Sequence, residues 1–488
     1  MKQERIRAAL ELIQDKYILE AATYKKRRVL PWIGTVAAAL ALIIGLQFLQ
    51  VPMAIEAKAV ALAEPARVEQ QPQPEDYPDR DRYRTESEHW ERTSALRLLN
   101  AQEATEQMKP FVYQSMQVFL GNKNSNQLFS PVNAYIGLAM TAELTGGQTQ
   151  QQLLDVLGTD DLEALRTQAS ALWEVTFAGN YSEVVYAGGG ANTVYVKEGT
   201  EVSILANSLW LDKTLSYNSR PMAALARHYY ASVYQQDLST PQATKDIQTW
   251  LNQNTGNSLE DAVNGIQLPE ETIMALFSTL YFRSHWMDEF NAGSNSYGVF
   301  HGASGNELAT FMNKNRYQTY CYFGKDFCAI ALELNNGSKM WFFLPDAKKT
   351  VEDILDDRQY LDMITAADGQ WGSKKYMLVN LSVPQFDIQT TTDLREGLQD
   401  MGITHLFDPA NADFSPSLNT PAYMSAVNQS VRVSVDEYGV TAAAYVNLPV
   451  PGDPMPPREL IDFILDRPFL FVITQEQIPL FAGVVNEM

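Results

Sequence analysis

Apolar and polar residues alternate most clearly near the C-terminus of the chain. Val431, Val433 and Val435 alternate with polar residues, which predicts a strand with one buried face. An acidic turn, a run of small residues and a proline-rich stretch follow. The prolines of the last stretch exclude a central strand there. Two apolar strands joined by a polar turn end the chain. In order, the segments are 431–436, 437–444, 447–458, 467–473 and 479–486. The small residues alone fit two interpretations equally well: a hinge that inserts between strands, or a surface loop after an edge strand.

The rest of the chain mixes helical and strand-like patterns without a regular repeat. Apolar residues at helical spacing predict helices near 111–120, 133–140 and 151–157. Residues 329–334 and 340–345 predict two strands around an Asn-Asn-Gly turn. Residues 176–203 are poorly patterned, which indicates a hairpin or a local insertion. Because strands and helices do not alternate regularly, the expected fold class is α+β.

An uncharged apolar stretch at residues 29–49 is long enough to cross a membrane as a helix. Four basic residues, 25–28, come directly before it, so the positive-inside rule places the N-terminus in the cytoplasm and the rest of the chain outside the cell membrane. A cleaved signal peptide is the main alternative, with Ala-x-Ala motifs at 57–59 and 61–63. A buried core helix agrees less well with the length and the flanking charges.

The expected organisation has four parts. A basic cytoplasmic segment, a single-pass anchor, a disordered stalk and a globular domain follow one another along the chain. The stalk is predicted from composition, since Gln, Pro, Glu, Asp and Arg dominate it and aliphatic residues are few. The bounds of the four parts are 1–28, 29–49, 50–95 and 96–488.

Charge and motif content argue against several functions. The net charge of −21 argues against nucleic acid as a partner, and against anionic membrane surfaces as a partner for the bulk of the chain. The five histidines are isolated, and no zinc spacing, nucleophile elbow, phosphate loop or dinucleotide fingerprint occurs. These features predict a protein that is not an enzyme and that needs no metal or cofactor. Cys321 and Cys328 fit opposite sides of a hairpin, either as a disulfide or as two half-buried thiols.

Several short motifs occur in the order in which they stand in one known family. They lie at 126–133, 146–149, 247–259, 281–286 with Phe290, 383–386, 401–403 and 412–415. Together with the C-terminal pattern, they make the chain resemble a serpin from residue 126 to its end. The resemblance implies a mixed main sheet, additional sheets, about nine helices and an exposed reactive-centre loop near the C-terminus.

The resemblance also implies a function. In serpins the main sheet lacks one strand, and a protease that cleaves the loop is held as an acyl-enzyme while the loop inserts as that strand. The protease is dragged across the molecule and its catalytic geometry is distorted. The chain is therefore expected to be a monomeric suicide inhibitor of a serine or cysteine protease, displayed outside the membrane.

The hinge of the loop follows from the same resemblance. Its residues are Glu437, Gly439, Val440, Thr441, Ala442, Ala443 and Ala444. In the family's register, alternate residues face the sheet interior after insertion, and all of them here are apolar: Val440, Ala442, Ala444, Val446 and Leu448. Val440 is uncharged, as in inhibitory members, and we expect it to be largely exposed before insertion.

Two regions that hold the sheet closed in serpins, the shutter and the breach, can also be assigned. The residues are Asn126, Ser130, Asn133, Ser278, Trp286, Gln385 and Gln429. Gln429 stands where histidine is usual and Ser278 stands where asparagine is usual. Gln385 stands where a lysine usually pairs with the breach glutamate, which predicts that Glu437 lacks an ion pair.

The position of the reactive bond is less constrained. Counting from the hinge and from the C-terminus gives different answers, because the loop is longer than in many members. The candidate residues are Asp453, Met455, Pro457, Arg458 and Glu459. Proline on the leaving side disfavours cleavage after Asp453 or Met455, so Arg458–Glu459 is preferred for its trypsin-like charge. Pro449 and Pro451 also oppose insertion beyond Leu448, because proline has no backbone N–H to donate to a neighbouring strand.

Two alternatives to inhibition remain open at the level of sequence. The first is a non-inhibitory ectodomain of the same fold, acting as a binding module or a cleavable sensor. The second is a hydrolase of unrelated fold with a dispersed catalytic triad, which no motif supports.

Overall fold

The computed structural model describes residues 59–64, 72, 74, 77, 79–121, 125–176, 179–187, 193–257, 259–269, 271–366, 371–440 and 459–488, with the backbone alone at 179–187, 193–201 and 261. The predicted cytoplasmic segment 1–28 and the predicted anchor 29–49 lie outside these ranges. Within them, no helix combines the length and the apolar character of a membrane span.

The helices of the described part number ten, slightly more than expected, with two short 3₁₀ turns. Their bounds are α3 (Arg80–Leu120), α4 (Pro131–Leu144), α5 (Gly147–Leu157), α6 (Leu162–Thr176), α7 (Ser219–His228), α8 (Pro241–Asn254), α9 (Glu260–Asn264), α10 (Val351–Leu355), α11 (Gln359–Thr365), α12 (Arg395–Asp400), η2 (Ala292–Ser294) and η3 (His405–Phe407). The helices predicted at 111–120, 133–140 and 151–157 lie within α3, α4 and α5, and α3 is much longer than predicted.

The strands form three sheets, and the class is α+β as expected. The largest sheet has the order β15-β11-β8-β9-β10-β16-β17-β2, with β7 paired to β8. The second has the order β1-β5-β4-β6-β14, with β3 paired to β4, and the third contains β12 and β13. The bounds are β1 (Val60–Ala63), β2 (Gln127–Phe129), β3 (Gly179–Ala187), β4 (Thr193–Asp212), β5 (Ala231–Gln236), β6 (Met274–His285), β7 (Ser296–Gly302), β8 (Gly305–Phe323), β9 (Phe327–Glu333), β10 (Lys339–Pro345), β11 (Lys374–Pro384), β12 (Phe386–Asp393), β13 (Asn428–Val435), β14 (Gly439–Val440), β15 (Leu460–Ile464), β16 (Phe469–Gln475) and β17 (Ile478–Val485).

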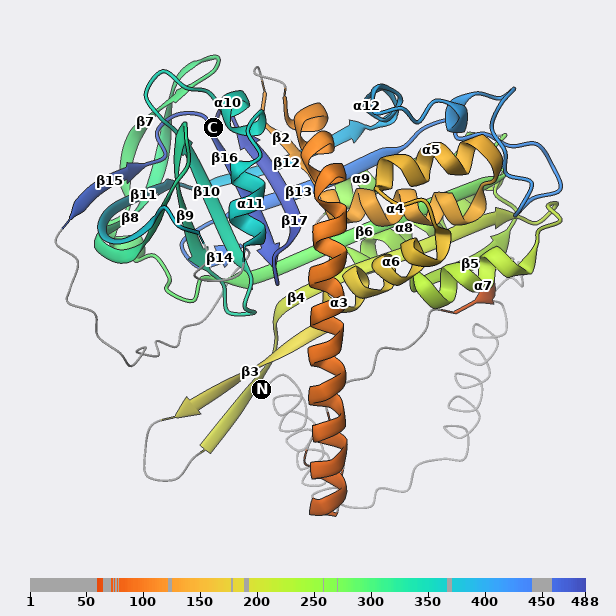
Figure 1. The fold of residues 1–488 in the computed structure, drawn as a ribbon, viewed down its shortest axis with the longest axis horizontal. Coiled ribbons are helices and arrows are strands. Elements are labelled where there is room, and N and C mark those ends of the chain that lie inside the picture. Colours follow the sequence, from red (N-terminus) through yellow and green to blue (C-terminus); the bar gives the residue numbers. More distant parts are fainter. Residues whose placement is uncertain are drawn as a thin grey trace, which may run out of the picture. The chain divides into compact units, whose positions relative to one another are not determined.

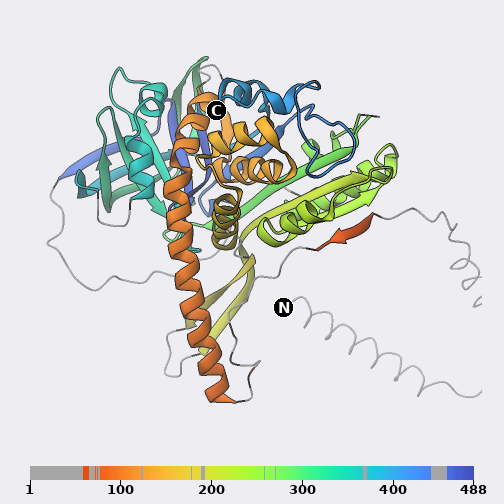
Figure 2. The ribbon, with the colours of Figure 1, turned by 45° about the vertical axis from the view of Figure 1, so that its right-hand side comes forward.

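Helices cover both faces of the sheet that contains β4 and β6. Along β4, Leu209 and Leu211 join the main core, to which α4 and α6 also contribute. Trp210 lies between them and points to the opposite face, where it packs with Ile247 and Leu251 of α8. Figures 1 and 2 show α4, α5 and α6 grouped beside these strands. The alternation along β4 therefore decides which helix each side chain meets.

The predicted domain boundary at residue 96 is wrong, because it falls inside α3. The helix begins at Arg80 and its N-cap Asp79 accepts a hydrogen bond from the Asp81 backbone N–H at 3.0 Å. Strand β1 lies still earlier, and it extends the second sheet by pairing with β5. Part of the predicted stalk therefore belongs to the folded domain.

Other predictions of the sequence hold. Val431, Val433 and Val435 are buried on one face of β13, and the predicted C-terminal hairpin is β16 and β17. Within 176–203, where a hairpin or an insertion was predicted, β3 pairs antiparallel with the first half of β4. The two strands around the Asn-Asn-Gly turn are β9 and β10.

Candidate functional site

The site begins with an interruption between strands β6 and β13. β6 pairs with β4 over residues 274–283, and β13 pairs with β12 over all its residues. On the other side of β6, the described residues supply a partner only at its end, where the two-residue strand β14 pairs with Ser284 and His285. The strands can be followed in Figure 1, with β14 at the end of β6. Most of one edge of β6 thus has no partner strand among the described residues.

A tight turn joins β13 to β14. The Asp436 backbone N–H donates to the Gly439 carbonyl oxygen at 3.1 Å. The Asp436 carboxylate accepts from the backbone N–H groups of Tyr438 at 2.9 Å and Gly439 at 3.1 Å. The turn therefore sends the chain back between β13 and β6.

Glycine is required at position 439 because β6 passes very close. A Cβ atom there would lie 2.5 Å from the Ser284 carbonyl oxygen and 2.6 Å from the His285 Cα. The next residue, Val440, is only 4% exposed and belongs to the main core. The expectation that Val440 is largely exposed before insertion is therefore wrong, since the turn has already seated it against β6. Its inward orientation agrees with the predicted register.

Of the predicted breach residues, Trp286 lies against the same turn, together with Phe290. The Trp286 indole N–H donates to the Asp436 carbonyl oxygen at 2.9 Å. The Trp286 backbone N–H donates to the Tyr438 carbonyl oxygen at 3.1 Å. The Glu437 carbonyl oxygen accepts from the Phe290 backbone N–H at 3.0 Å. Trp286 is 1% exposed and packs edge-on against Phe290. These contacts hold the turn against the end of β6.

Glu437 is bound by a residue that the sequence did not indicate. The Asn295 side chain donates to the Glu437 carboxylate. Gln385 uses its backbone N–H to bond Thr310 at 2.8 Å, and no hydrogen bond joins its side chain to Glu437 in the described structure. Asn295 follows the short turn η2, and nothing in the local pattern signals its role. A neutral amide therefore contacts Glu437 here.

A half-buried lysine, Lys314, contacts the segment next to the breach. Lys314 on β8 donates from Nζ to the carbonyl oxygens of Asp288 and Glu289, each at 2.8 Å, and pairs with the Asp288 carboxylate at 2.8 Å. Its ammonium also lies 4.9 Å from the centre of the Phe290 ring. Burial lowers the pKa of Lys314, although the Asp288 carboxylate opposes the shift. The lysine fixes the segment that carries Phe290.

The shutter is a closed polar network under the interruption. The Gln429 side chain accepts from the Ser130 backbone N–H at 2.9 Å and donates to the Ser130 carbonyl oxygen at 3.0 Å and to Asn133 Oδ1 at 3.3 Å. Asn133 Nδ2 then donates to Ser278 Oγ at 2.8 Å. Because Gln429 lies on β13 and Ser278 on β6, the first turn of α4 links the two strands. The glutamine and the serine thus complete the predicted shutter despite their departure from the family pattern.

Two other predicted features lie elsewhere. Asn126 joins no shutter residue; its side chain donates to the Glu487 carbonyl oxygen and accepts from the backbone N–H groups of Asn486 and Glu487. Both cysteines are free, Cys321 buried and Cys328 half-buried, which agrees with the thiol alternative and not with the disulfide. The two cysteines lie on the two strands of one hairpin, as predicted, with Cys321 on β8 and Cys328 on β9, although their partners in the ladder are Ile330 and Phe323.

Much of the predicted loop lies outside the described residues. This holds for the hinge residues Thr441, Ala442, Ala443 and Ala444, and for the bond candidates Asp453, Met455, Pro457 and Arg458. Glu459 is described, and its carbonyl oxygen accepts from the Leu378 backbone N–H at 2.9 Å. This hydrogen bond joins Glu459 to β11, just before strand β15 begins. Among the described residues, no cluster of side chains suits a metal ion.

The comparison with protein families decides the identity of this arrangement. A family model described as "Serpin (serine protease inhibitor)" matches residues 107–488. The chain belongs to the serpin family. Among curated serpins, plasminogen activator inhibitor 1 of Sus scrofa is 29% identical over 76% of this chain and 89% of its own length. Serpin-ZX of Arabidopsis thaliana is 26% identical over 75% of this chain and 92% of its own length.

Solved serpin structures share the fold. The native state of Tengpin, a thermophilic serpin, has a TM-score of 0.66 at 20% identity and covers 88% of this chain and 100% of its own. A thyroxine-binding globulin complex with thyroxine has a TM-score of 0.60 at 20% identity, and it covers 80% of this chain and 99% of its own.

Proposed function

We propose that this serpin inhibits a serine or cysteine protease by inserting its cleaved loop as a strand between β6 and β13. The observation that carries the proposal is β14, because its two residues already pair with β6 at the end of the interruption. A strand that has started needs only to be extended once cleavage releases the loop. The family description and the inhibitor among the relatives support the same function.

The register of β14 predicts where each loop residue would lie. Gly439 pairs with His285 and Val440 with Ser284. Continued antiparallel pairing puts Ala444 opposite Leu280, Val446 opposite Ser278 and Leu448 opposite Leu276. Because β6 begins at Met274, the prolines at 449 and 451 would meet only its first residue pairs or lie beyond it. They limit the length of insertion without preventing it.

Insertion also acts on the shutter. Extension of the turn between Asp436 and Gly439 puts Val446 opposite Gln429 on β13, as well as opposite Ser278 on β6. Val446 would therefore arrive between the two strands that Asn133 links. We infer that the shutter bonds of Asn133 are exchanged as the loop passes this point.

The reactive bond belongs to this proposal too. Arg458–Glu459 stays our preferred bond because it offers a cation to a trypsin-like protease. The hydrogen bond from Leu378 to the Glu459 carbonyl oxygen would have to open for that bond to enter an active site. Mass measurement of the fragment released by trypsin identifies the bond.

The inhibitory mechanism is tested by looking for a trapped protease. The ectodomain is mixed with a panel of serine and cysteine proteases and run on a denaturing gel, where an inhibitor gives a covalent complex. A melting curve before and after loop cleavage tests strand insertion, which should raise Tm. If no protease is trapped and cleavage leaves Tm unchanged, the protein is the non-inhibitory binding module or sensor instead.

We propose further that residues 29–49 anchor the serpin in the cell membrane, with the N-terminus in the cytoplasm. The uncharged span and the basic residues before it support this orientation. Protease added to intact cells should remove the serpin domain and leave a small membrane-bound remnant. A protected serpin domain contradicts the orientation, and a soluble chain that begins near residue 60 indicates signal-peptide cleavage.

A further inference from the structure

A hollow of about 420 Å³ lies between helices α6 and α7, apart from the loop and the sheet interruption. The wall from α7 carries two arginines, Arg220 and Arg227, two helical turns apart. Ala223 and Ala224 lie between them and leave room above the helix. The wall from α6 carries Glu163 and Arg166.

Among the described residues, the arginines of α7 have no carboxylate within ion-pair distance. In the described residues, neither Arg220 nor Arg227 forms an ion pair with a carboxylate, and both are exposed. This is unusual in a chain with 58 acidic and 37 basic residues, where carboxylates are in excess. The two side chains are thus a concentration of uncompensated positive charge beside a hollow.

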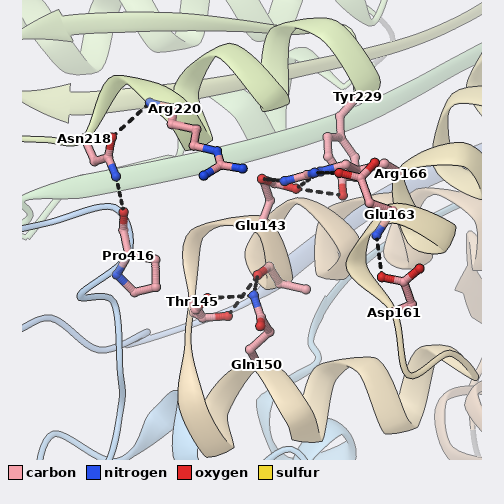
Figure 3. Close-up of polar contacts among 11 residues, drawn as sticks. Glu143, Thr145, Gln150, Asp161, Glu163, Arg166, Asn218, Arg220, Tyr229 and Pro416 are labelled. Atoms are coloured by element: carbon pink, nitrogen blue, oxygen red, sulfur yellow. Dashed lines mark hydrogen bonds and ion pairs between the residues drawn. The ribbon is translucent and has the colours of Figure 1, made fainter.

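Arg166 is held differently, and its position is fixed. Its guanidinium binds the buried Glu143 of α4 through two bonds, Nε to Oε2 at 2.8 Å and Nη2 to Oε1 at 2.5 Å, and it also contacts Glu163. Figure 3 shows this cluster, with Tyr229 beside Glu143 and Arg220 nearby on α7. The Glu143 carboxylate raises the pKa of Arg166, so the arginine stays charged. Glu163 is the only carboxylate of the described lining, and Arg166 compensates it.

We propose that this hollow binds a tetrahedral oxyanion of the phosphate type, either free or as a phosphate monoester. Guanidinium groups present several N–H donors in a plane and bind such anions through paired hydrogen bonds. Arg220 and Arg227 supply the free donors, and the two alanines leave space for the anion between them. The bound group ties α7 to α6 and, through Arg166 and Glu143, to α4.

The consequence is ligand-dependent stability of the native state. A ligand that binds the folded chain and not the unfolded chain raises the free energy of unfolding as its concentration rises above Kd. Because α4 also carries Asn133 of the shutter, the stabilised helix is the one that links β6 and β13. This consequence does not require the chain to be an inhibitor.

The test is titration of the full-length chain with anions at constant ionic strength. Calorimetry and thermal unfolding are followed with inorganic phosphate, glycerol phosphate and, as the reference, chloride. Phosphate and its ester should bind and raise Tm where chloride does not. Tighter binding of the ester identifies a phosphorylated molecule as the ligand, and equal binding identifies free phosphate.

Variants decide whether the binding belongs to this hollow. Arg220→Ala and Arg227→Ala should each weaken phosphate binding about tenfold or more, since a hydrogen-bonded charged contact is lost. Arg84→Ala, at an exposed arginine near the start of α3, should bind as the original chain does. Both arginines of α7 are exposed, so the variants should melt normally in chloride. The proposal is overturned if the chain binds phosphate no more tightly than chloride. It is also overturned if the original chain and all three variants bind phosphate equally well.

Discussion

At the scale of single residues, the shutter works through hydrogen-bonding capacity and not through residue identity. The Gln429 amide offers one acceptor and two donors, and it uses them on Ser130 and Asn133. Histidine, usual at this position in the family, changes charge near neutral pH, whereas glutamine does not. The four side chains of this shutter are all uncharged, so its bonds do not depend on protonation.

Loss of the Gln429 amide should weaken the native state. Gln429→Ala leaves the buried Ser130 N–H without its acceptor, which should lower the free energy of unfolding by about 1–3 kcal/mol. Gln389→Ala removes an exposed glutamine from the neighbouring strand β12 and should change it by less than about 0.5 kcal/mol. Urea unfolding of both variants checks this difference. Equal effects would mean that the network contributes no stability.

The buried ion pair between α4 and α6 gives a second matched pair of variants. The Glu143 side chain is 3% exposed and Glu163 is 71% exposed, yet both bind Arg166. Glu143→Gln leaves a largely buried guanidinium poorly compensated and should cost about 3 kcal/mol. Glu163→Gln removes a solvated partner and should cost less than about 1 kcal/mol. Denaturant unfolding compares them, and a larger loss for Glu163→Gln would contradict the role given to burial.

At the scale of elements, the sequence predicted what depends on local pattern. The valines of β13 and the apolar run of β16 reveal their strands because one face, or both, is buried. The start of α3 was missed because residues 80–100 are mostly polar and exposed, so neither periodicity nor composition marks them. Strand β1 was missed because its pairing with β5 joins residues far apart in the chain.

The sequence located the shutter residues of the site but not the contacts that depend on tertiary packing. The resemblance located Ser130, Asn133, Ser278 and Gln429, and the structure joins all four through hydrogen bonds. Asn295 was not located, because its contact with Glu437 depends on how η2 packs near the turn. The burial of Val440 was missed for a related reason: the Asp436 turn is a tertiary feature that alternation does not report.

The N-terminal elements lead to a prediction about where the domain can be cut. A chain that begins at Ala59 keeps β1 and the whole of α3, whereas a chain that begins at Leu96 loses β1 and the first turns of the helix. Both should fold, because the buried residues of α3 start at Ala101. The shorter chain should melt lower and associate with itself, since it exposes the edge of β5.

Thermal unfolding and size-exclusion chromatography of the two chains provide the measurement. Insolubility of the chain from Leu96 would show that the early elements are needed for folding itself. Identical melting and elution of the two chains would show that β1 adds nothing to the sheet.

At the scale of the whole molecule, most of one edge of β6 has no partner strand among the described residues. The breach and the shutter act at different points of the same interruption, one at the turn of Asp436 and one at Asn133. Between them, β6 offers residues 274–283 to a partner that is not among the described residues. The loop that continues from Val440 is the nearest chain in sequence, and in the proposed register it would reach the shutter at Val446.

Whether the loop enters the sheet is decided by a pair of variants at neighbouring positions. Val440→Arg is unsuitable, because Val440 is already buried and the native state would suffer. Ala444 would face the interior after insertion and Ala443 would face outward. An unpaired buried cation costs several kcal/mol, so Ala444→Arg should oppose insertion. Ala443→Arg should permit it, because its charge would reach solvent.

The measurements are the covalent complex and the melting temperature after cleavage. Ala443→Arg should trap a susceptible protease and gain Tm on cleavage, as the original chain does. Ala444→Arg should be cleaved at the same rate, release the protease and gain much less. Equal trapping and equal gain in Tm for the two variants would mean that residue 444 does not enter the sheet interior, and insertion in this register would then be wrong.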